Sequence, residues 1–414
     1  MTSREKVQLA FAHKDGLVPL DLGGGPTSGI HCSVVGALRE HYGLAKHPVT
    51  VNEPYQMLGQ IEDDLKDAMG IDTVPFWTPY TMFGFRNEDW KEFRTPWGQV
   101  VLVPGRFEYD RLHNGDIILY PNGNRDAHPS GRMPASSYFF DAIIRQEEIL
   151  EEELDPADNT KEFEFISEED LGRYRELAAG AGGTERFVFG NLGGTAFGDI
   201  SMVPAVGLER PRGIRDITEW YVSTITRPDY LHAVFNAQAE VGIANLARIH
   251  EAVGDVIGLN YVCGTDFGTQ SSTFCSRETY DELYKPYLLK VNNWIHQNTS
   301  WKTFKHSCGA VFDFMPDFID SGFDAINPVQ LSAAGMDPVK LKTEFGRHIV
   351  FWGGAVDTQQ TLPFGSPEEV RAEVLRNCEI FSPAGGFVAS SVHNIQAKTP
   401  VENVVAMGGG IRGF

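Results

Sequence analysis

Short apolar runs alternate with longer amphipathic segments along the second half of the chain, from about residue 187. The apolar runs have the length of buried strands, and the segments between them have the apolar spacing of helices with one buried face. The predicted strands are 186–190, 256–262, 303–305, 325–327, 349–353 and 386–390. The predicted helices are 229–252, 277–297, 310–321, 337–345 and 367–380. Regular alternation of strands and helices produces a parallel sheet, so the pattern predicts an α/β fold.

The first residues of the chain predict a short helix at 4–14 and a strand at 18–22. A glycine-rich loop follows at 23–29. It lacks the lysine and serine or threonine of a P-loop and the spacing of a dinucleotide-binding fingerprint, so phosphate binding is not indicated. The loop is either one wall of a ligand pocket or a plain connection.

A β-ribbon is predicted at 97–123, where apolar runs at 100–103 and 116–120 flank the turn sequence Asn114-Gly115. This ribbon interrupts the alternation of strands and helices. It is therefore expected to be an insertion or cap on the main fold.

Residues 147–170 are rich in glutamate and aspartate. Such a run is typical of a solvated helix and linker, and a face for a protein partner is the alternative. Together with the ribbon, it forms the expected insertion or cap, about 97–175, within a single domain over residues 1–414.

The length of 414 residues suits an α/β barrel with insertions, or two domains. A net charge of −21 repels phosphate backbones, so nucleic acid is not an expected partner. No run approaches the ~20 apolar residues of a membrane helix. The N-terminus is charged from Arg4 and has no apolar segment, so a cytoplasmic protein is expected. The five cysteines form no Cys-x-x-Cys pair and are expected to be reduced thiols.

Polar side chains follow five of the predicted strands. In a β/α barrel the active site lies at the carboxyl ends of the strands, so these residues are expected to converge on one pocket. They are Asp266, His306, Cys308, Asn327, Gln330, Asp357 and His393.

The pair His306-x-Cys308 predicts a zinc site, because imidazole and thiolate are both good zinc ligands. A third ligand has to come from another part of the fold, and His393 at a second strand end is the best candidate. Three protein ligands leave one coordination position open, which is typical of a catalytic site.

Asp266 stands in the triplet Asp-Phe-Gly, but none of the other kinase motifs accompanies it, so a kinase is excluded. At a strand end its carboxylate could act as a proton donor, as a base or as a fourth metal ligand. A role in capping or bracing the loop is an equal alternative, and the same applies to Asp357.

Several stretches of the second half resemble the uroporphyrinogen decarboxylase superfamily, and within it the cobalamin-dependent methyltransferases. The resemblance is dense from about 255 to 407 and implies a TIM barrel with an N-terminal extension and the β-ribbon insertion. The stretches are Asp266-Phe-Gly-Thr-Gln, Tyr284-Lys-Pro-Tyr-Leu, Phe304-Lys-His-Ser-Cys-Gly, Gly322-Phe-Asp-Ala-Ile-Asn-Pro-Val-Gln, Gly335-Met-Asp-Pro, Phe351-Trp-Gly-Gly-Ala-Val-Asp-Thr-Gln and Thr399-Pro-Val-Glu-Asn.

The decarboxylases of this superfamily grip their porphyrinogen with an arginine-rich N-terminal signature. The corresponding stretch here, residues 21–31, contains no arginine. A substrate with several carboxylates needs cationic partners, so decarboxylation is disfavoured.

The methyltransferases carry His-x-Cys and a distant cysteine as zinc ligands. In this chain His306 and Cys308 match, and His393 stands where the cysteine is expected. Replacing a thiolate by a neutral imidazole leaves a harder Lewis acid, which polarises oxygen better. The departure therefore favours demethylation of a methyl ether over methylation of a thiol such as coenzyme M.

The resemblance implies two cofactors, zinc and a corrinoid. The corrinoid is expected to be presented by a separate partner protein. Asp266 is the expected catalytic carboxylate, and the expected pocket residues are Asn327, Gln330, Asp357, Tyr80 and Met82. The aromatic stretch that contains Tyr80 and Met82 is either a wall for an aromatic methoxy substrate or ordinary core. The alternatives kept are a methylcorrinoid:thiol methyltransferase, a porphyrinogen decarboxylase and a non-enzymatic binding barrel, and a homodimer is left open.

Overall fold

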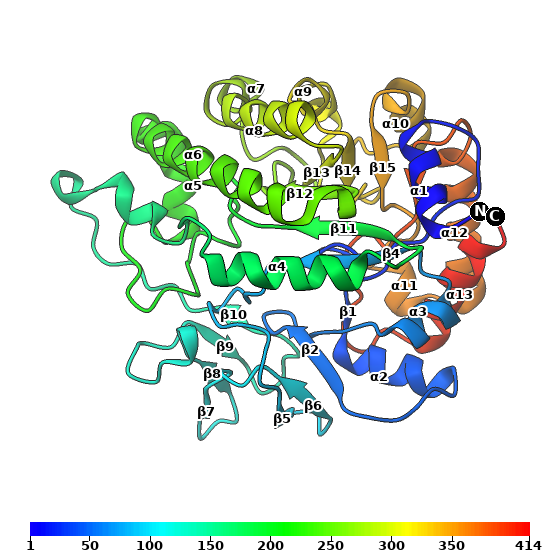
Figure 1. The fold of residues 1–414 in the computed structure, drawn as a ribbon, viewed down its shortest axis with the longest axis horizontal. Helices are drawn as coiled ribbons and strands as arrows, with labels where there is room; N and C mark the ends of the chain where they lie inside the picture. The colour runs from blue at the N-terminus through cyan, green and yellow to red at the C-terminus, as the bar shows by residue number, and fades with distance from the viewer.

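The computed structural model describes residues 1–414 and is built around a seven-stranded parallel sheet that curls on itself (Figure 1). The strand order is β16-β15-β14-β13-β12-β11-β4. All six strands predicted in the second half of the chain belong to this sheet. The strands are β4 (Thr73–Trp77), β11 (Phe187–Asn191), β12 (Leu259–Cys263), β13 (Lys302–His306), β14 (Ala325–Asn327), β15 (Val350–Trp352) and β16 (Phe387–Val388).

Residues 18–22 close this sheet into a barrel. Leu20 forms a parallel bridge with Ala389, beside β16, and Asp21 donates its backbone N–H to the Ala389 carbonyl. On the other side, the N–H of Asp72, beside β4, donates to the carbonyl of Leu20. The predicted strand at 18–22 therefore lies between the two edges of the sheet, and the TIM-barrel fold class is confirmed.

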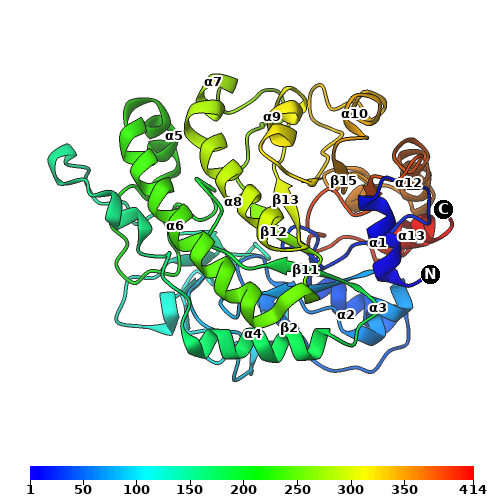
Figure 2. The ribbon, with the colours of Figure 1, turned by 45° about the horizontal axis from the view of Figure 1, so that its top comes forward.

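Helices that connect successive strands cover the outside of the barrel (Figure 2). The five helices predicted in the second half are present. One of them contains a π-helical stretch after its first turn, and another begins with a turn of 3-10 helix. The elements are α5 (Ile217–Thr226), α6 (Pro228–Val253), η4 (Gly254–Val256), α7 (Arg277–Thr279), η5 (Tyr280–Tyr284), α8 (Lys285–Asn298), η6 (Phe312–Phe314), α9 (Met315–Asp320), α10 (Pro338–Phe345), α11 (Thr361–Phe364), α12 (Pro367–Phe381) and α13 (Val401–Arg412).

Helix α1 (Ser3–Phe11) closes the end of the barrel opposite the site. Its Val7 and Ala10 are buried in the same cluster as Phe187 and Trp352, which point into the barrel. The ring of Phe11 lies 6.1 Å from that of Phe187. The barrel interior is therefore a packed core, and the open space for chemistry is left at the carboxyl ends of the strands.

Two small sheets lie on one side of the barrel, below it in Figure 1. They have the orders β1-β3-β2-β6-β5 and β10-β9-β8-β7. Their elements, with the helices between and after them, are β1 (Ile30–His31), α2 (Cys32–His41), β2 (Val49–Glu53), β3 (Leu58–Gly59), α3 (Asp63–Met69), β5 (Lys91–Arg94), β6 (Val100–Val103), β7 (Tyr109–Arg111), β8 (Ile117–Leu119), η1 (Pro121–Gly123), β9 (Gly131–Met133), β10 (Asp141–Ala142) and α4 (Glu168–Ala181).

The predicted β-ribbon is present, but the strand at 117–119 pairs with 109–111 and not with the predicted run 100–103. Asn114-Gly115 joins β7 to β8, whereas the apolar run 100–103 is β6 and pairs with β2 and β5. The sequence Pro104-Gly105 separates β6 from β7 and directs the two runs into different sheets.

The acidic segment 147–170 is less helical than expected. It contains the 3-10 turns η2 (Glu151–Glu153) and η3 (Pro156–Thr160), and α4 begins only at Glu168. Like charges close together disfavour a continuous helix here. No helix in the structure has both the length and the apolar character needed to cross a membrane.

Candidate metal centre

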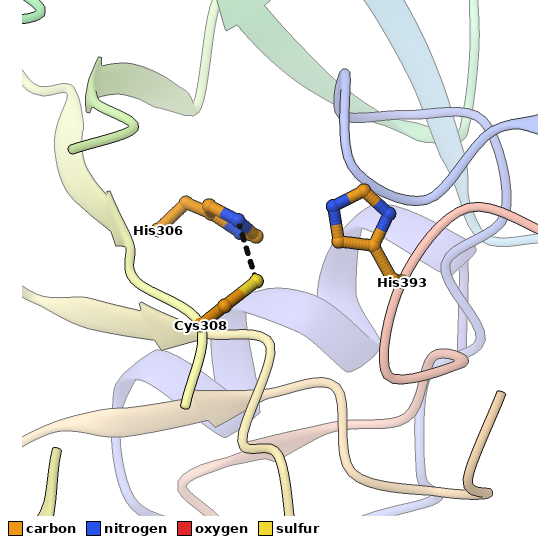
Figure 3. Close-up of side chains that lie close together, drawn as sticks. All are labelled: His306, Cys308 and His393. Carbon is orange, nitrogen blue, oxygen red and sulfur yellow. Dashed lines mark hydrogen bonds between the residues drawn. The ribbon is translucent and has the colours of Figure 1, made fainter. Parts of the chain in front are cut away.

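Three side chains that can bind a metal meet at the carboxyl ends of β13 and β16. His306 is the last residue of β13, Cys308 lies in the turn after it, and His393 lies in the loop after β16. Their ligand atoms all lie within 4.8 Å of one another, and Cys308 Sγ is 3.3 Å from His306 Nε2. Figure 3 shows the His393 ring facing the other two side chains. The structure therefore brings the three predicted ligands together, and that they bind a metal stays a prediction.

The ring of His306 is held in one orientation by Asn327 at the end of β14. The Nδ1–H of His306 donates to Asn327 Oδ1 over 2.5 Å, and the hydroxyl of Thr27 donates to the same oxygen over 2.9 Å. The amide of Asn327 donates to the carbonyl of Trp352. The contact between His306 Nδ1 and Asn327 Oδ1 places the proton of His306 on Nδ1 and leaves Nε2 free to bind a metal. Outer-shell partners of metal-bound histidines have the same effect.

The replacement Asn327→Ala is expected to weaken zinc binding by about 10–100-fold, because it removes the partner that fixes the tautomer and the angle of His306. A titration against a chromogenic chelator measures the affinity. Asn377→Ala is the matched control, since Asn377 is equally buried and donates to the carbonyls of Gly354 and Ala355. Equal zinc affinity in the two variants would contradict the role of Asn327.

The turn that carries Cys308 is held by the loop after β12. Asp266 Oδ1 accepts the backbone N–H of Cys308 over 2.7 Å, and Ser307 Oγ accepts that of Phe267 over 2.8 Å. Gln330 Oε1 accepts the N–H of Gly309 over 2.8 Å. Two of the predicted pocket residues, Asp266 and Gln330, therefore fix the position of the thiol.

Two glycines let these loops touch backbone to backbone. Gly309 has φ +86°, and a Cβ added to it would lie 2.4 Å from the carbonyl carbon of Gly268. A Cβ on Gly268 would likewise lie 2.6 Å from the nitrogen of Ala310. Any larger residue here would push the Cys308 turn away from the loop after β12.

Gly309→Ala is therefore expected to cost about 2–4 kcal/mol of unfolding free energy, the sum of backbone strain and the forced separation of the two loops. Gly98→Ala is the control, because Gly98 has φ +88° and no atom within 4 Å of an added Cβ. The control should lose only about 1–2 kcal/mol for the left-handed conformation. Urea unfolding measures both values, and equal losses would show that the close contact is unimportant.

His393 is held by its neighbour. The backbone N–H of Asn394 donates to His393 Nδ1 over 2.8 Å, and Nε2 makes no hydrogen bond within the protein. In this tautomer Nε2 carries the proton. A metal bound at Nε2 would move that proton to Nδ1 and end the contact with Asn394, so His393 is expected to be the weakest of the three ligands.

The glycine-rich loop at 23–29 forms part of the wall around the site. Thr27 reaches Asn327, and the N–H of Gly29 donates to the side chain of Asn394 over 2.6 Å. Of the two interpretations left open for this loop, the wall of a site is the one that the structure supports.

Burial decides the protonation of the three side chains. It lowers the pKa of His306 and of His393 to about 4, so both imidazoles are neutral at pH 7. Burial raises the pKa of the Cys308 thiol well above its ordinary value, and the carboxylate of Asp266 raises it further. A thiolate therefore needs a cation beside it, and metal binding is expected to release a proton.

The three donors fit zinc. Tetrahedral zinc with ligands at about 2.0–2.3 Å places neighbouring ligand atoms roughly 3.4–3.8 Å apart. The separations here, up to 4.8 Å, approach this range and need only small rotations of the side chains. One thiolate with two imidazoles is a soft and borderline donor set of the kind that zinc prefers.

Comparison with known proteins identifies the second half of the chain. A protein-family model described as uroporphyrinogen decarboxylase (URO-D) matches residues 210–412. This part of the chain is a uroporphyrinogen decarboxylase family domain. The match confirms the superfamily resemblance drawn from the sequence motifs, and a search of curated proteins found no match.

One of two similar solved structures shows the same fold. A methyltransferase from Methanosarcina mazei has a TM-score of 0.56 at 16% identity, with 99% of this chain and 98% of that chain covered. A B12-independent methionine synthase from Shewanella sp. W3-18-1 in complex with selenomethionine has a TM-score of 0.35 at 13% identity, with 60% of this chain and 66% of that chain covered. At such identities the first similarity shows the fold alone, and the second carries no argument.

The remaining predicted pocket residues of this uroporphyrinogen decarboxylase-like barrel lie as follows. Asp357 Oδ1 accepts the N–H groups of Gln359 and Gln360, so the carboxylate braces its own turn. The hydroxyl of Tyr80 accepts from Arg86, and Met82 is partly buried against the main core. A substrate contact by Asp357, Tyr80 or Met82 stays a prediction.

Sequence reasoning missed one residue at the metal centre, Thr27. Thr27 belongs to a loop whose role was left open, and only the closed barrel brings it to Asn327.

Proposed function

We propose that this protein is a methyltransferase that moves a methyl group from the oxygen of a methyl ether to the Co(I) of a corrinoid on a separate protein. The observation that carries the proposal is the donor set His306, Cys308 and His393 at the mouth of a uroporphyrinogen decarboxylase-like barrel. The similarity of the whole chain to the fold of a methyltransferase supports it.

The donor set suits an oxygen-bearing substrate. Two thiolates would make the metal electron-rich, which favours a bound thiolate that has to stay nucleophilic. Here Cys308 would be the one thiolate once a metal is bound, and the two imidazoles are neutral. Zinc bound at this site would supply a Lewis acid for the leaving oxygen.

The chain's own residues would position the substrate. Asp266 uses Oδ1 to hold the Cys308 turn, and its Oδ2 makes no hydrogen bond within the protein. The side chain is 26% exposed, and Oδ1 lies 3.8 Å from His306 Nε2. We assign Asp266 to the substrate side of the metal centre, where it orients the ether and accepts a hydrogen bond.

Porphyrinogen decarboxylation is the less favoured reaction of this family for this chain. The stretch 21–31 provides Asp21 and Thr27 rather than arginine. Asp21 is fully buried and accepts from Thr73 and Trp352, so it braces the barrel and offers nothing to a polyanion.

The proposed function is tested with the purified protein, zinc, free cob(I)alamin and a panel of methoxyarenes. Methyl transfer converts the absorption spectrum of cob(I)alamin into that of methylcob(III)alamin and releases a phenol. Zinc content is measured by mass spectrometry on the same sample. A protein with one zinc per chain and no transfer from any methyl ether, but with transfer from methylcob(III)alamin to a thiol, would favour the alternative half-reaction.

A further inference from the structure

His393 stands apart from the other two predicted ligands, on the loop between β16 and α13 (Figure 3). His306 and Cys308 belong to one short turn, so their relative position follows from that turn alone. The ring of His393 lies 5.4 Å from the ring of His306, although no backbone of the same segment connects them. The place of the third donor therefore depends on whatever holds its loop.

The side chain of Asn394 holds this loop. Asn394 is 1% exposed. Its Oδ1 accepts the N–H of Gly29 over 2.6 Å. Its Nδ2 donates to the carbonyl of Pro26 over 3.2 Å and to Oε1 of Gln56 over 3.1 Å. These three bonds use both N–H groups and the oxygen of the amide, so the side chain is fixed in one orientation.

Gln56 brings the small sheets into contact with this loop. It lies in the turn between β2 and β3, and Glu53 holds the turn by accepting the backbone N–H groups of Tyr55 and Gln56 over 2.9 and 2.7 Å. Oε1 of Gln56 also accepts from Nε2 of Gln396, at 3.5 Å. One oxygen of the small sheets thus receives two side chains of the His393 loop.

The bonds of the Asn394 amide do not involve the His393 ring. The ring is held by the backbone N–H of Asn394, in a contact that a metal at Nε2 would end. The amide bonds would remain, so the loop keeps its place while the ring changes partners. A loop that is already ordered loses no backbone entropy when its histidine binds a metal, and this strengthens binding.

We infer that Gln56 is a positioning residue for His393, and that through Asn394 it keeps the third donor within reach of the other two. The small sheets lie outside the barrel, and by this contact they become part of the metal centre. The inference deepens the proposed function, on which it rests for the role of the metal.

A double-mutant cycle tests the inference on the full-length protein. Gln56→Met keeps the length of the side chain and removes the acceptor oxygen. Zinc affinity, measured by competition with a chromogenic chelator, should fall by about tenfold, the lower end of the effect of outer-shell partners. In the His393→Ala background the same replacement should change zinc affinity less than twofold, because its effect passes through His393. A general loss of structure would lower the affinity in both backgrounds.

Two further variants serve as controls. Gln56→Glu keeps an acceptor oxygen and should bind zinc within about threefold of the wild type, since a charged acceptor still receives the Asn394 amide. Gln99→Met is the matched control, because Gln99 is also a half-buried glutamine of the small sheets but accepts from Trp97. It should bind zinc as the wild type does. Circular dichroism verifies that each variant is folded.

Wild-type zinc affinity in Gln56→Met, or an equal loss in both backgrounds of the cycle, would overturn the role of Gln56. If methyl transfer from an ether to cob(I)alamin were found in the same experiments, the proposed function would stand without it. The expected cycle with no transfer from any methyl ether would support the role of Gln56 and refute the proposed function.

Discussion

Replacing Cys308 by alanine is expected to abolish zinc binding and methyl transfer together. Cys308 is the one donor of the set that becomes an anion on binding, and the two imidazoles that remain are neutral. Zinc content should fall from about one ion per chain to near zero. Transfer to cob(I)alamin should fall by more than about 100-fold, since even the loss of an outer-shell partner costs 10–100-fold.

Cys378→Ala is the control for this result. Cys378 is a buried thiol on α12 and is not part of the donor set. That variant should keep its zinc and lose at most a modest part of its stability. Zinc retained in Cys308→Ala, or transfer lost without loss of zinc, would contradict the assignment of Cys308 as a ligand.

The barrel half of the fold was predictable because each of its strands is buried on both faces. Runs such as Val350–Trp352 are apolar throughout and stand between amphipathic helices. The pattern therefore predicts both the strands and the helices between them. The ends of these strands then indicate the site, because a parallel barrel brings all carboxyl ends together. His306, Cys308 and His393 were found in this way although 85 residues separate the last two.

The pairing within the small sheets and the contacts between loops at the site were less predictable from the sequence. The pairing of β6 with β2 joins residues about 50 positions apart through short strands, and no local pattern records such a pairing. The hydrogen bond from Thr27 to Asn327 spans 300 positions and exists only once the barrel is closed. The positions of Asp266 and Gln330 were predicted, but their bonds to the Cys308 turn depend on how two loops pack and were not.

His393→Cys is expected to shift the preferred reaction from ether demethylation toward thiol methylation. The variant restores the two-thiolate donor set that the resemblance implies for thiol methyltransferases. A second thiolate makes bound zinc more electron-rich, so the metal polarises an ether oxygen less and stabilises a nucleophilic thiolate more. Transfer from a methoxyarene should fall by about tenfold or more, and transfer from methylcob(III)alamin to a thiol should rise above the wild-type level.

Two measurements make this result decisive. In the cobalt-substituted protein the intensity of the sulfur-to-metal absorption counts the thiolates, and it should double in His393→Cys. His393→Ala serves as the comparison, because it removes the imidazole without adding a thiol, and it should keep zinc with weakened affinity since His393 gives up the Asn394 contact to bind. If the doubled absorption came with an unchanged ratio of ether to thiol activity, the number of thiolates would not control the reaction. If His393→Ala kept full activity and affinity, His393 would not be a ligand at all.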